Sequence, residues 1–269
     1  MLHLYHAGPS VCSVKVRLGL AEKNLSWQSM PIAIDKGEQF TPQYLELNPN
    51  GVVPTLVDDD FIVIESSIIL EYIDQLCDKT QLMPNELKAQ TQTKIWLLRC
   101  LDIHAAINTL TFATAMRTKI LANNTPEEIE ASIAKIPNKN AATKRRDLIN
   151  NGLSSAYVES DLNTLKRLFD DMHNALSKQT WLMSDSHSMA DIALLAYIDR
   201  LERLGFSGLW THTPEVNRWL EQSRARESYS IAVDPFISPQ AAQGMRSSGE
   251  KLWPELKKQW QVCLNASQK

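Results

Sequence analysis

Apolar residues in the first quarter of the chain alternate in some stretches and recur at helical spacing in others. Residues 2–5 alternate apolar and polar positions like a short strand, and the apolar residues within 14–21 favour a helix that ends near Lys23. Residues 25–34 read as a second strand. Thr41-Pro42 then begins a helical turn, because proline is tolerated where its missing N–H would have no partner. The pattern predicts β-α-β-α.

Two more strands and a helix complete this region. Residues 54–57 and 61–64 flank the polar turn 58–60, and a helix is expected over 66–76. The resulting order, β-α-β-α-β-β-α, is thioredoxin-like. We therefore predict an α/β thioredoxin-like domain over residues 1–80, with a boundary near 79–86.

The rest of the chain has long helical patterns, which predict an all-helical domain over residues 88–269. One helix start is marked by Ser188 and Asp191, which have the form of a capping box: the Ser188 hydroxyl accepts from the Asp191 N–H, and the carboxylate reaches back. Residues 123–151 contain two prolines and several asparagines, and we interpret them as an interrupted insertion between helices.

The C-terminal extension, residues 235–269, is expected to begin as a loop. It contains Pro235, Pro239 and Gly244, which favour irregular structure. An amphipathic helix is predicted after this loop from apolar residues four positions apart, namely Leu252, Leu256, Trp260 and Leu264.

Composition narrows the class of protein. The 269 residues are 43% hydrophobic and 22% charged, and the 28 basic and 31 acidic side chains give a net charge of −3. These values exclude a disordered chain and disfavour nucleic-acid binding. The four cysteines lack metal-ligand spacing, so we expect reduced thiols, no metal site and an intracellular protein. No signal peptide or membrane-spanning run is evident, and the expected location is the cytoplasm.

The segment 8–13, between the first strand and first helix, is the first candidate for chemistry. A helix start offers unpaired N–H groups and a partial positive charge, which stabilise an anion such as a thiolate. Ser10, Cys12 and Ser13 all lie in this segment. The alternative is that Ser10 or Ser13 is an ordinary helix cap.

Two further positions could bind a ligand through the backbone. If Pro54 follows a cis peptide bond, the backbone groups of Val53 would be free to pair with an extended peptide. The alternative is an ordinary edge-strand proline. Glu65 and Ser66 stand where the last strand meets the last helix of this domain, so Ser66 could cap that helix and its N–H could bind a carboxylate.

Together these motifs resemble the glutathione transferase superfamily over nearly the whole chain. The matching stretches follow family order and spacing, and they are residues 4–23, 48–56, 65–66 with 69–73, and 188–191. The resemblance implies an enzyme that activates the thiol of glutathione, its co-substrate, for attack on a small hydrophobic electrophile. It also implies a homodimer. The alternative is a non-catalytic binding or interaction module on the same fold.

The resemblance also implies roles for individual residues. Val53, before cis-Pro54, would pair with the cysteinyl part of glutathione. Glu65 and Ser66 would hold its γ-glutamyl end, and Gln39 stands where relatives place a residue near the glycyl end.

Two catalytic roles stay open. Ser10 matches the serine that stabilises the thiolate in the zeta and theta classes. Ser10, Cys12 and Ser13 together have a Ser-x-Cys-Ser form, similar to tetrachlorohydroquinone reductive dehalogenase, in which the cysteine forms a mixed disulfide with glutathione. On that similarity Cys12 would be the nucleophile and Ser10 would assist.

A second resemblance concerns the substrate. Residues 136–137, 144–146 and 151–153 are similar to the bacterial β-etherases, which cleave aryl ethers with glutathione. The basic trio 144–146 also has the simpler interpretation of a solvated helix face. Four residues at four-residue spacing could face the acceptor or pack in a helix bundle, namely His104, Asn108, Phe112 and Met116.

Overall fold

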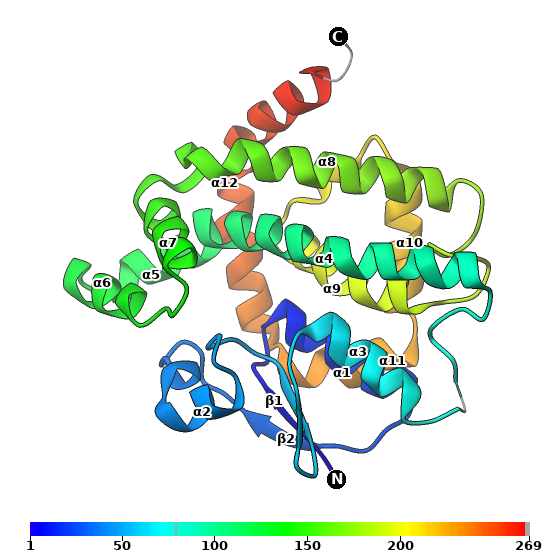
Figure 1. Cartoon of the computed structure of the whole chain (residues 1–269). Helices are drawn as coiled ribbons and strands as arrows, with labels where there is room; N and C mark the ends of the chain where they lie inside the picture. Colours follow the sequence, from blue (N-terminus) through cyan, green and yellow to red (C-terminus); the bar gives the residue numbers. More distant parts are fainter. Residues whose placement is uncertain (79, 267–269) are drawn as a thin grey trace. The chain divides into compact units, whose positions relative to one another are not determined.

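The computed structural model describes residues 1–78 and 80–266 (Figure 1). Lys79, in the predicted domain boundary, and residues 267–269, at the end of the predicted extension, lie outside the described residues. The chain forms two compact units. The first unit is Met1–Cys100, Gln179–Ala196 and Leu220–Ser238, and the second is Leu101–Lys178, Tyr197–Trp219 and Pro239–Lys269.

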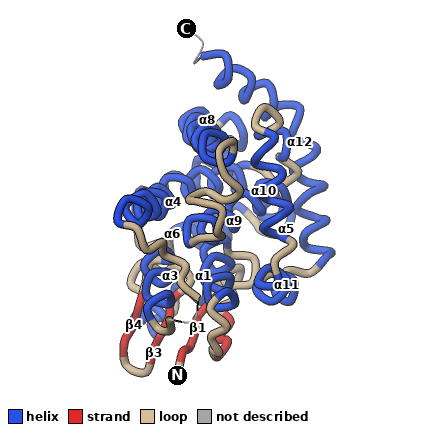
Figure 2. Tube along the Cα trace, turned by 90° about the vertical axis from the view of Figure 1, so that its right-hand side faces the viewer, coloured by secondary structure: helices blue, strands red, loops and turns tan. Residues whose placement is uncertain are grey.

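The first unit contains one mixed four-stranded sheet, in which β1 is parallel to β2 and antiparallel to β3, while β3 and β4 are antiparallel. Figure 2 shows β1, β3 and β4 side by side, near α1 and α3. The order β-α-β-α-β-β-α is confirmed. The bounds are β1 Leu2–His6, α1 Val11–Glu22, β2 Gln28–Pro31, α2 Pro42–Leu47, β3 Thr55–Asp58, β4 Phe61–Val63 and α3 Ser66–Gln75.

The core of the sheet follows from the alternation seen in the sequence. Leu2 and Leu4 of β1 point to one face, where they meet Leu56 of β3 and the apolar sides of α1 and α3. The second strand is shorter than the predicted 25–34. It ends at Pro31 because the chain then turns, and the Glu38 carboxylate accepts from the Ala33 N–H at 2.7 Å within this turn.

The remaining elements are helices, and α4 contributes residues to both units. None of the helices within residues 1–78 and 80–266 is long and apolar enough to cross a membrane. The bounds are α4 Leu87–Ala113, α5 Ala115–Asn123, α6 Pro126–Ala134, α7 Lys139–Asn151, α8 Ala156–Leu176, α9 Met189–Arg203, α10 Pro214–Arg224, α11 Glu227–Ala232 and α12 Pro239–Ala266.

The predicted insertion is mainly helical, since α6 and α7 occupy most of it and lie beside α5 in Figure 1. The predicted loop at the start of the extension is too long. Helix α12 already begins at Pro239, because proline fits the first helical position, and Gly244 lies inside the helix.

The start of α9 is held by the Asp191 carboxylate, as the capping-box motif predicted. Asp191 Oδ2 accepts from the Ser188 N–H at 2.9 Å. The Ser188 hydroxyl also donates to the same carboxylate oxygen at 2.7 Å, which ties Ser188 and Asp191 together by a second bond. Asp191 Oδ1 accepts from the Leu182 N–H, so this carboxylate also holds the preceding loop.

Candidate functional site

Ser10 is the N-cap of α1, and its hydroxyl oxygen accepts from the Ser13 N–H at 3.3 Å. The capping role considered for Ser10 is therefore observed. This role uses a lone pair on the oxygen and leaves the hydroxyl proton for donation to another group. The side chain is half-buried. Ser10 can cap the helix and donate a hydrogen bond to an anion at the same time.

The loop before Ser10 is held by Arg17, a residue that the sequence analysis did not single out. The buried Arg17 guanidinium donates from Nη2 to the Gly8 carbonyl at 2.9 Å and from Nε to the Ala232 carbonyl at 2.8 Å. It also lies 4.2 Å from the centre of the Phe236 ring. A side chain at Gly8 would place Cβ 2.5 Å from the Phe236 carbonyl oxygen, so only glycine fits this approach.

Cys12, in the first turn of α1, is half-buried, and all four cysteines are reduced thiols. Burial raises the pKa of the Cys100 thiol, and Cys12 also raises it, while Lys15 lowers it. The buried Lys15 ammonium donates to Ser67 Oγ at 3.1 Å. Cys12 therefore stands close to a second thiol and a buried cation.

The Val53–Pro54 peptide bond is cis, as the sequence analysis considered. Two side chains hold the preceding turn: the Tyr44 hydroxyl donates to the Val52 carbonyl at 2.7 Å, and the Asn48 amide donates to the same oxygen at 2.9 Å. No residue in the described part of the chain bonds the backbone N–H or C=O of Val53. These groups can pair with an extended peptide.

Glu65 is the N-cap of α3, so the prediction that Ser66 caps this helix is wrong. Ser66 is instead the first helical residue, where its N–H lacks an intrahelical acceptor. Glu65 has φ +67°, a left-handed backbone conformation that costs a non-glycine residue about 1–3 kcal/mol. The Glu65 side chain is exposed, and Ser66 is half-buried.

Gln39 lies in the 3₁₀ helix Glu38–Phe40 and is half-buried. Its Nε2 donates to the Ile34 carbonyl at 3.3 Å. Its Oε1 is buried and has no hydrogen-bond donor among the residues that the structure describes. Since a buried polar oxygen is normally paired, this atom is a candidate ligand contact.

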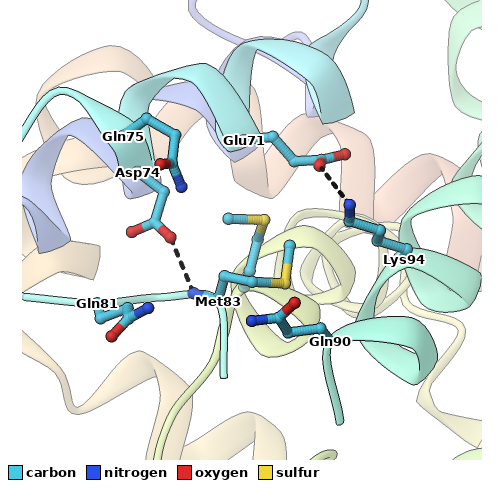
Figure 3. A pocket seen from close by; sticks show the side chains of 8 residues that line it. Glu71, Asp74, Gln75, Gln81, Met83, Gln90 and Lys94 are labelled. Atoms are coloured by element: carbon cyan, nitrogen blue, oxygen red, sulfur yellow. Dashed lines mark hydrogen bonds and ion pairs between the residues drawn. The ribbon is translucent and has the colours of Figure 1, made fainter. Parts of the chain in front are cut away.

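A cavity of about 290 Å³ lies elsewhere in the first unit, between the end of α3 and the start of α4 (Figure 3). Asp74 on its wall is already bonded to the Lys23 ammonium at 3.0 Å and to the Met83 N–H at 3.0 Å. The predicted ligand residues do not line this cavity, whose walls are Glu71, Asp74, Gln75, Gln81, Met83, Gln90, Lys94 and Met189. Within the described residues, no group of three or more His, Cys, Asp and Glu side chains could hold a metal ion.

Comparison with known proteins identifies the family. Residues 1–75 match the glutathione S-transferase N-terminal domain, and residues 125–227 match the glutathione S-transferase C-terminal domain. The chain belongs to the glutathione S-transferase superfamily. It is a glutathione transferase, and glutathione is its co-substrate.

Three relatives place the chain within the superfamily. Protein LigF of Sphingobium sp. is 28% identical over 235 residues, 84% of this chain and 90% of LigF. The crystal structure of that β-etherase has a TM-score of 0.74 at 26% identity, covering 86% of this chain and 98% of LigF. A zeta-class transferase of Euphorbia esula is 38% identical over 86 residues, 32% of this chain and 38% of the relative. The transferase TCHQD of Arabidopsis thaliana is 23% identical over 249 residues, 88% and 91% of the two chains.

Proposed function

We propose that this enzyme transfers glutathione to an aryl ether or a related hydrophobic electrophile, and that Ser10 stabilises the attacking thiolate. The observation that carries the proposal is the hydrogen bonding of Ser10. Its oxygen accepts from the Ser13 N–H, so the hydroxyl proton is left for donation to sulfur. The N–H groups at the start of α1 add positive potential at the same place.

The other predicted residues offer what the tripeptide needs. The backbone of Val53 has an unpaired donor and acceptor for the cysteinyl residue. Ser66 presents a helix N–H for the γ-glutamyl carboxylate, and Glu65 a carboxylate for its ammonium. The buried Oε1 of Gln39 is an acceptor for the glycyl N–H. These assignments complement the charge at the γ-glutamyl end of glutathione.

The energetic requirement is modest. A thiol has a pKa of about 8.5, and lowering it by about two units takes roughly 2.7 kcal/mol of preferential thiolate stabilisation. A hydroxyl hydrogen bond to an anion contributes about 1.5–3 kcal/mol, and the helix start about 0.3–1 kcal/mol. Ser10 and α1 together are therefore sufficient at neutral pH.

The likeness to the β-etherase LigF supports an aryl ether as the acceptor. In this reaction the thiolate forms a carbon–sulfur bond as the carbon–oxygen bond breaks. The aryloxide leaves and takes up a proton equivalent to the one that the thiol released.

The likeness to TCHQD supports a second candidate, reductive dehalogenation. The glutathione thiolate would displace halide from the acceptor, and the Cys12 thiolate would then attack the glutathionyl sulfur. The carbon–sulfur bond would break, the acceptor carbon would keep the electron pair and take up a proton, and Cys12 and glutathione would form the mixed disulfide. A second glutathione would release Cys12 and form glutathione disulfide, which balances the reduction of the acceptor.

An assay of aryl ether cleavage by glutathione distinguishes the proposed roles of Ser10 and Cys12. It compares wild type with Ser10→Ala, Cys12→Ser and the control Cys77→Ser. We expect Ser10→Ala to lower kcat/KM about 100-fold at pH 7, the kinetic equivalent of about 2.7 kcal/mol. Cys12→Ser and Cys77→Ser should retain most of the activity, and glutathione should still bind Ser10→Ala. A larger loss in Cys12→Ser would contradict the role of Ser10.

Thiolate absorbance tests the same assignment without an acceptor. In wild type the thiol pKa of bound glutathione should lie well below the thiol pKa of free glutathione. In Ser10→Ala the thiol pKa of bound glutathione should rise towards the free value. An unshifted pKa in wild type would support the alternative of a non-catalytic binding module.

We also infer that the enzyme is a homodimer. Ile68 of α3, Ile95 and Leu98 of α4 are 54%, 52% and 69% exposed. Ser67 donates to the Leu97 carbonyl at 3.3 Å, so the start of α3 lies against this part of α4. An apolar surface of this kind on a transferase is suited to a second copy of the chain.

A further inference from the structure

The basic trio 144–146 of α7 lies in the second unit, and its three side chains have different kinds of partner. Lys144 donates to Asp161 at 2.8 Å, and Arg146 makes a two-pronged contact with Glu130 at 2.7 and 2.9 Å. All three side chains are half-buried, so the interpretation of the trio as a helix face open to solvent holds in part, but two of the cations are engaged by carboxylates. The third is Arg145.

Arg145 packs on an aromatic ring instead of a carboxylate. Its guanidinium carbon lies 3.1 Å from the centre of the Phe112 ring of α4. No hydrogen bond or ion pair joins it to any residue that the structure describes. Burial lowers the pKa of Arg145 to about 10, so the side chain still carries its charge at pH 7.

Arg145 is half-buried, and among the three basic residues of this trio it alone has an aromatic ring in place of a carboxylate partner within the described chain. Arg117, nearby in the same unit, differs: it donates to the carbonyls of Ile149 and Asn150 at 2.8 and 3.2 Å. None of the Arg145 nitrogens is among the fully enclosed polar atoms, so an ion can reach them. The charge of Arg145 is available to a ligand.

The surroundings of Arg145 indicate what this ligand is. Phe112 covers one face of the guanidinium, which leaves the N–H edge for a carboxylate, and a carboxylate matches that edge with two parallel hydrogen bonds. Asn108 lies one turn before Phe112 on the same half-buried face of α4. Its amide makes no hydrogen bond to another residue of the described chain. The face combines an aromatic ring, an amide and a cation.

We propose that Arg145 and Phe112 bind the carboxylate of a planar organic acid. Both residues belong to the second unit. The site therefore goes beyond the proposed glutathione site, whose residues belong to the first unit.

Calorimetric titration with 2-naphthoate and its neutral analogue 2-naphthamide tests the site without turnover. Wild type should bind naphthoate about tenfold or more tightly than the amide, the contribution of a charge-assisted hydrogen bond. Arg145→Gln should abolish this preference, and Arg145→Lys should keep part of it, since it preserves charge but not the two-pronged geometry. Arg146→Gln is the matched control and should keep the preference in full.

The result that overturns the proposal is equal binding of acid and amide by wild type, or an undiminished preference in folded Arg145→Gln. An equal loss in Arg146→Gln would also overturn it, because the effect would then be general electrostatics. Glutathione is titrated against the same variants. A weaker affinity of glutathione for Arg145→Gln would identify the co-substrate as the source of the carboxylate and contradict a separate acid-binding site. Because no step depends on catalysis, a failed aryl ether assay leaves this result readable.

Discussion

At the scale of single residues, the Ser10 loop depends on a buried arginine and a neutral histidine. Arg17 Nη1 lies 3.1 Å from His6 Nδ1, and an arginine can only donate, so Nδ1 is the acceptor. His6 Nε2 then carries the proton and donates to Ser29 Oγ at 2.8 Å. Burial, and after it the charge of Arg17, lower the pKa of His6 to about 4.

This histidine should make stability depend on pH. The unfolded chain takes up a proton near pH 6.5, whereas folded His6 resists protonation down to about pH 4. Stability from His6 is therefore lost as pH falls from about 6.5 to about 4, by at most about 1.4 kcal/mol per pH unit. Urea unfolding at pH 7 and pH 5 should show a larger decrease for wild type than for His6→Gln. Carboxylates titrate alike in both proteins, so an equal decrease would contradict this account.

At the scale of elements, α12 contains two glycines in opposite situations. Gly249 packs so closely on the residue that follows α9 that a Cβ would lie 1.8 Å from the Leu204 carbonyl oxygen. At Gly244, five residues earlier, an added Cβ would have no atom within 4 Å. Gly249 therefore sets how closely α12 approaches the end of α9, while Gly244 only weakens the helix.

The two glycines make a matched pair of substitutions. Gly249→Ala should destabilise the protein by about 3 kcal/mol, because the Leu204 backbone must move. Gly244→Ala should stabilise it by about 0.5–1 kcal/mol, since alanine favours the helix. Thermal unfolding of both variants checks this. Equal shifts of the midpoint would show that the close approach of α12 does not exist in solution.

The same helix shows how far the sequence predicts elements. Local signals such as Thr41-Pro42 and Ser188 to Asp191 marked helix starts correctly, because capping depends on neighbours along the chain. The loop predicted from Pro239 and Gly244 was too long, since proline suits a helix start as well as a loop. The environments of Arg17 and Arg145 were not predictable, because each depends on residues of other segments.

At the scale of the whole molecule, the compact units do not follow chain order. The first unit gathers Gln179–Ala196 and Leu220–Ser238 around the sheet domain. Arg226 joins the later segment to α1, since it donates to both carboxylate oxygens of Glu22 at 2.7 and 2.8 Å. Such contacts leave no local pattern in the sequence. The predicted domains, 1–80 and 88–269, stay a prediction based on chain order.

The proposed homodimer is tested by a charge in the exposed apolar surface of α3 and α4. Leu98→Glu would bury a carboxylate against the second copy, which costs several kcal/mol unless the charge is paired. Light scattering after size exclusion should give twice the 30.4 kDa chain mass for wild type and a single chain mass for Leu98→Glu at micromolar concentration.

Val262→Glu is the matched control for the dimer, because Val262 of α12 is 65% exposed and Leu98 is 69% exposed. Val262→Glu should remain dimeric. The folded single chain should unfold at the same thermal midpoint in both variants. A monomeric wild type would contradict the dimer. Dissociation of Val262→Glu, with Leu98→Glu intact, would place the interface on α12 instead, because the added charge disrupts only the surface that is covered.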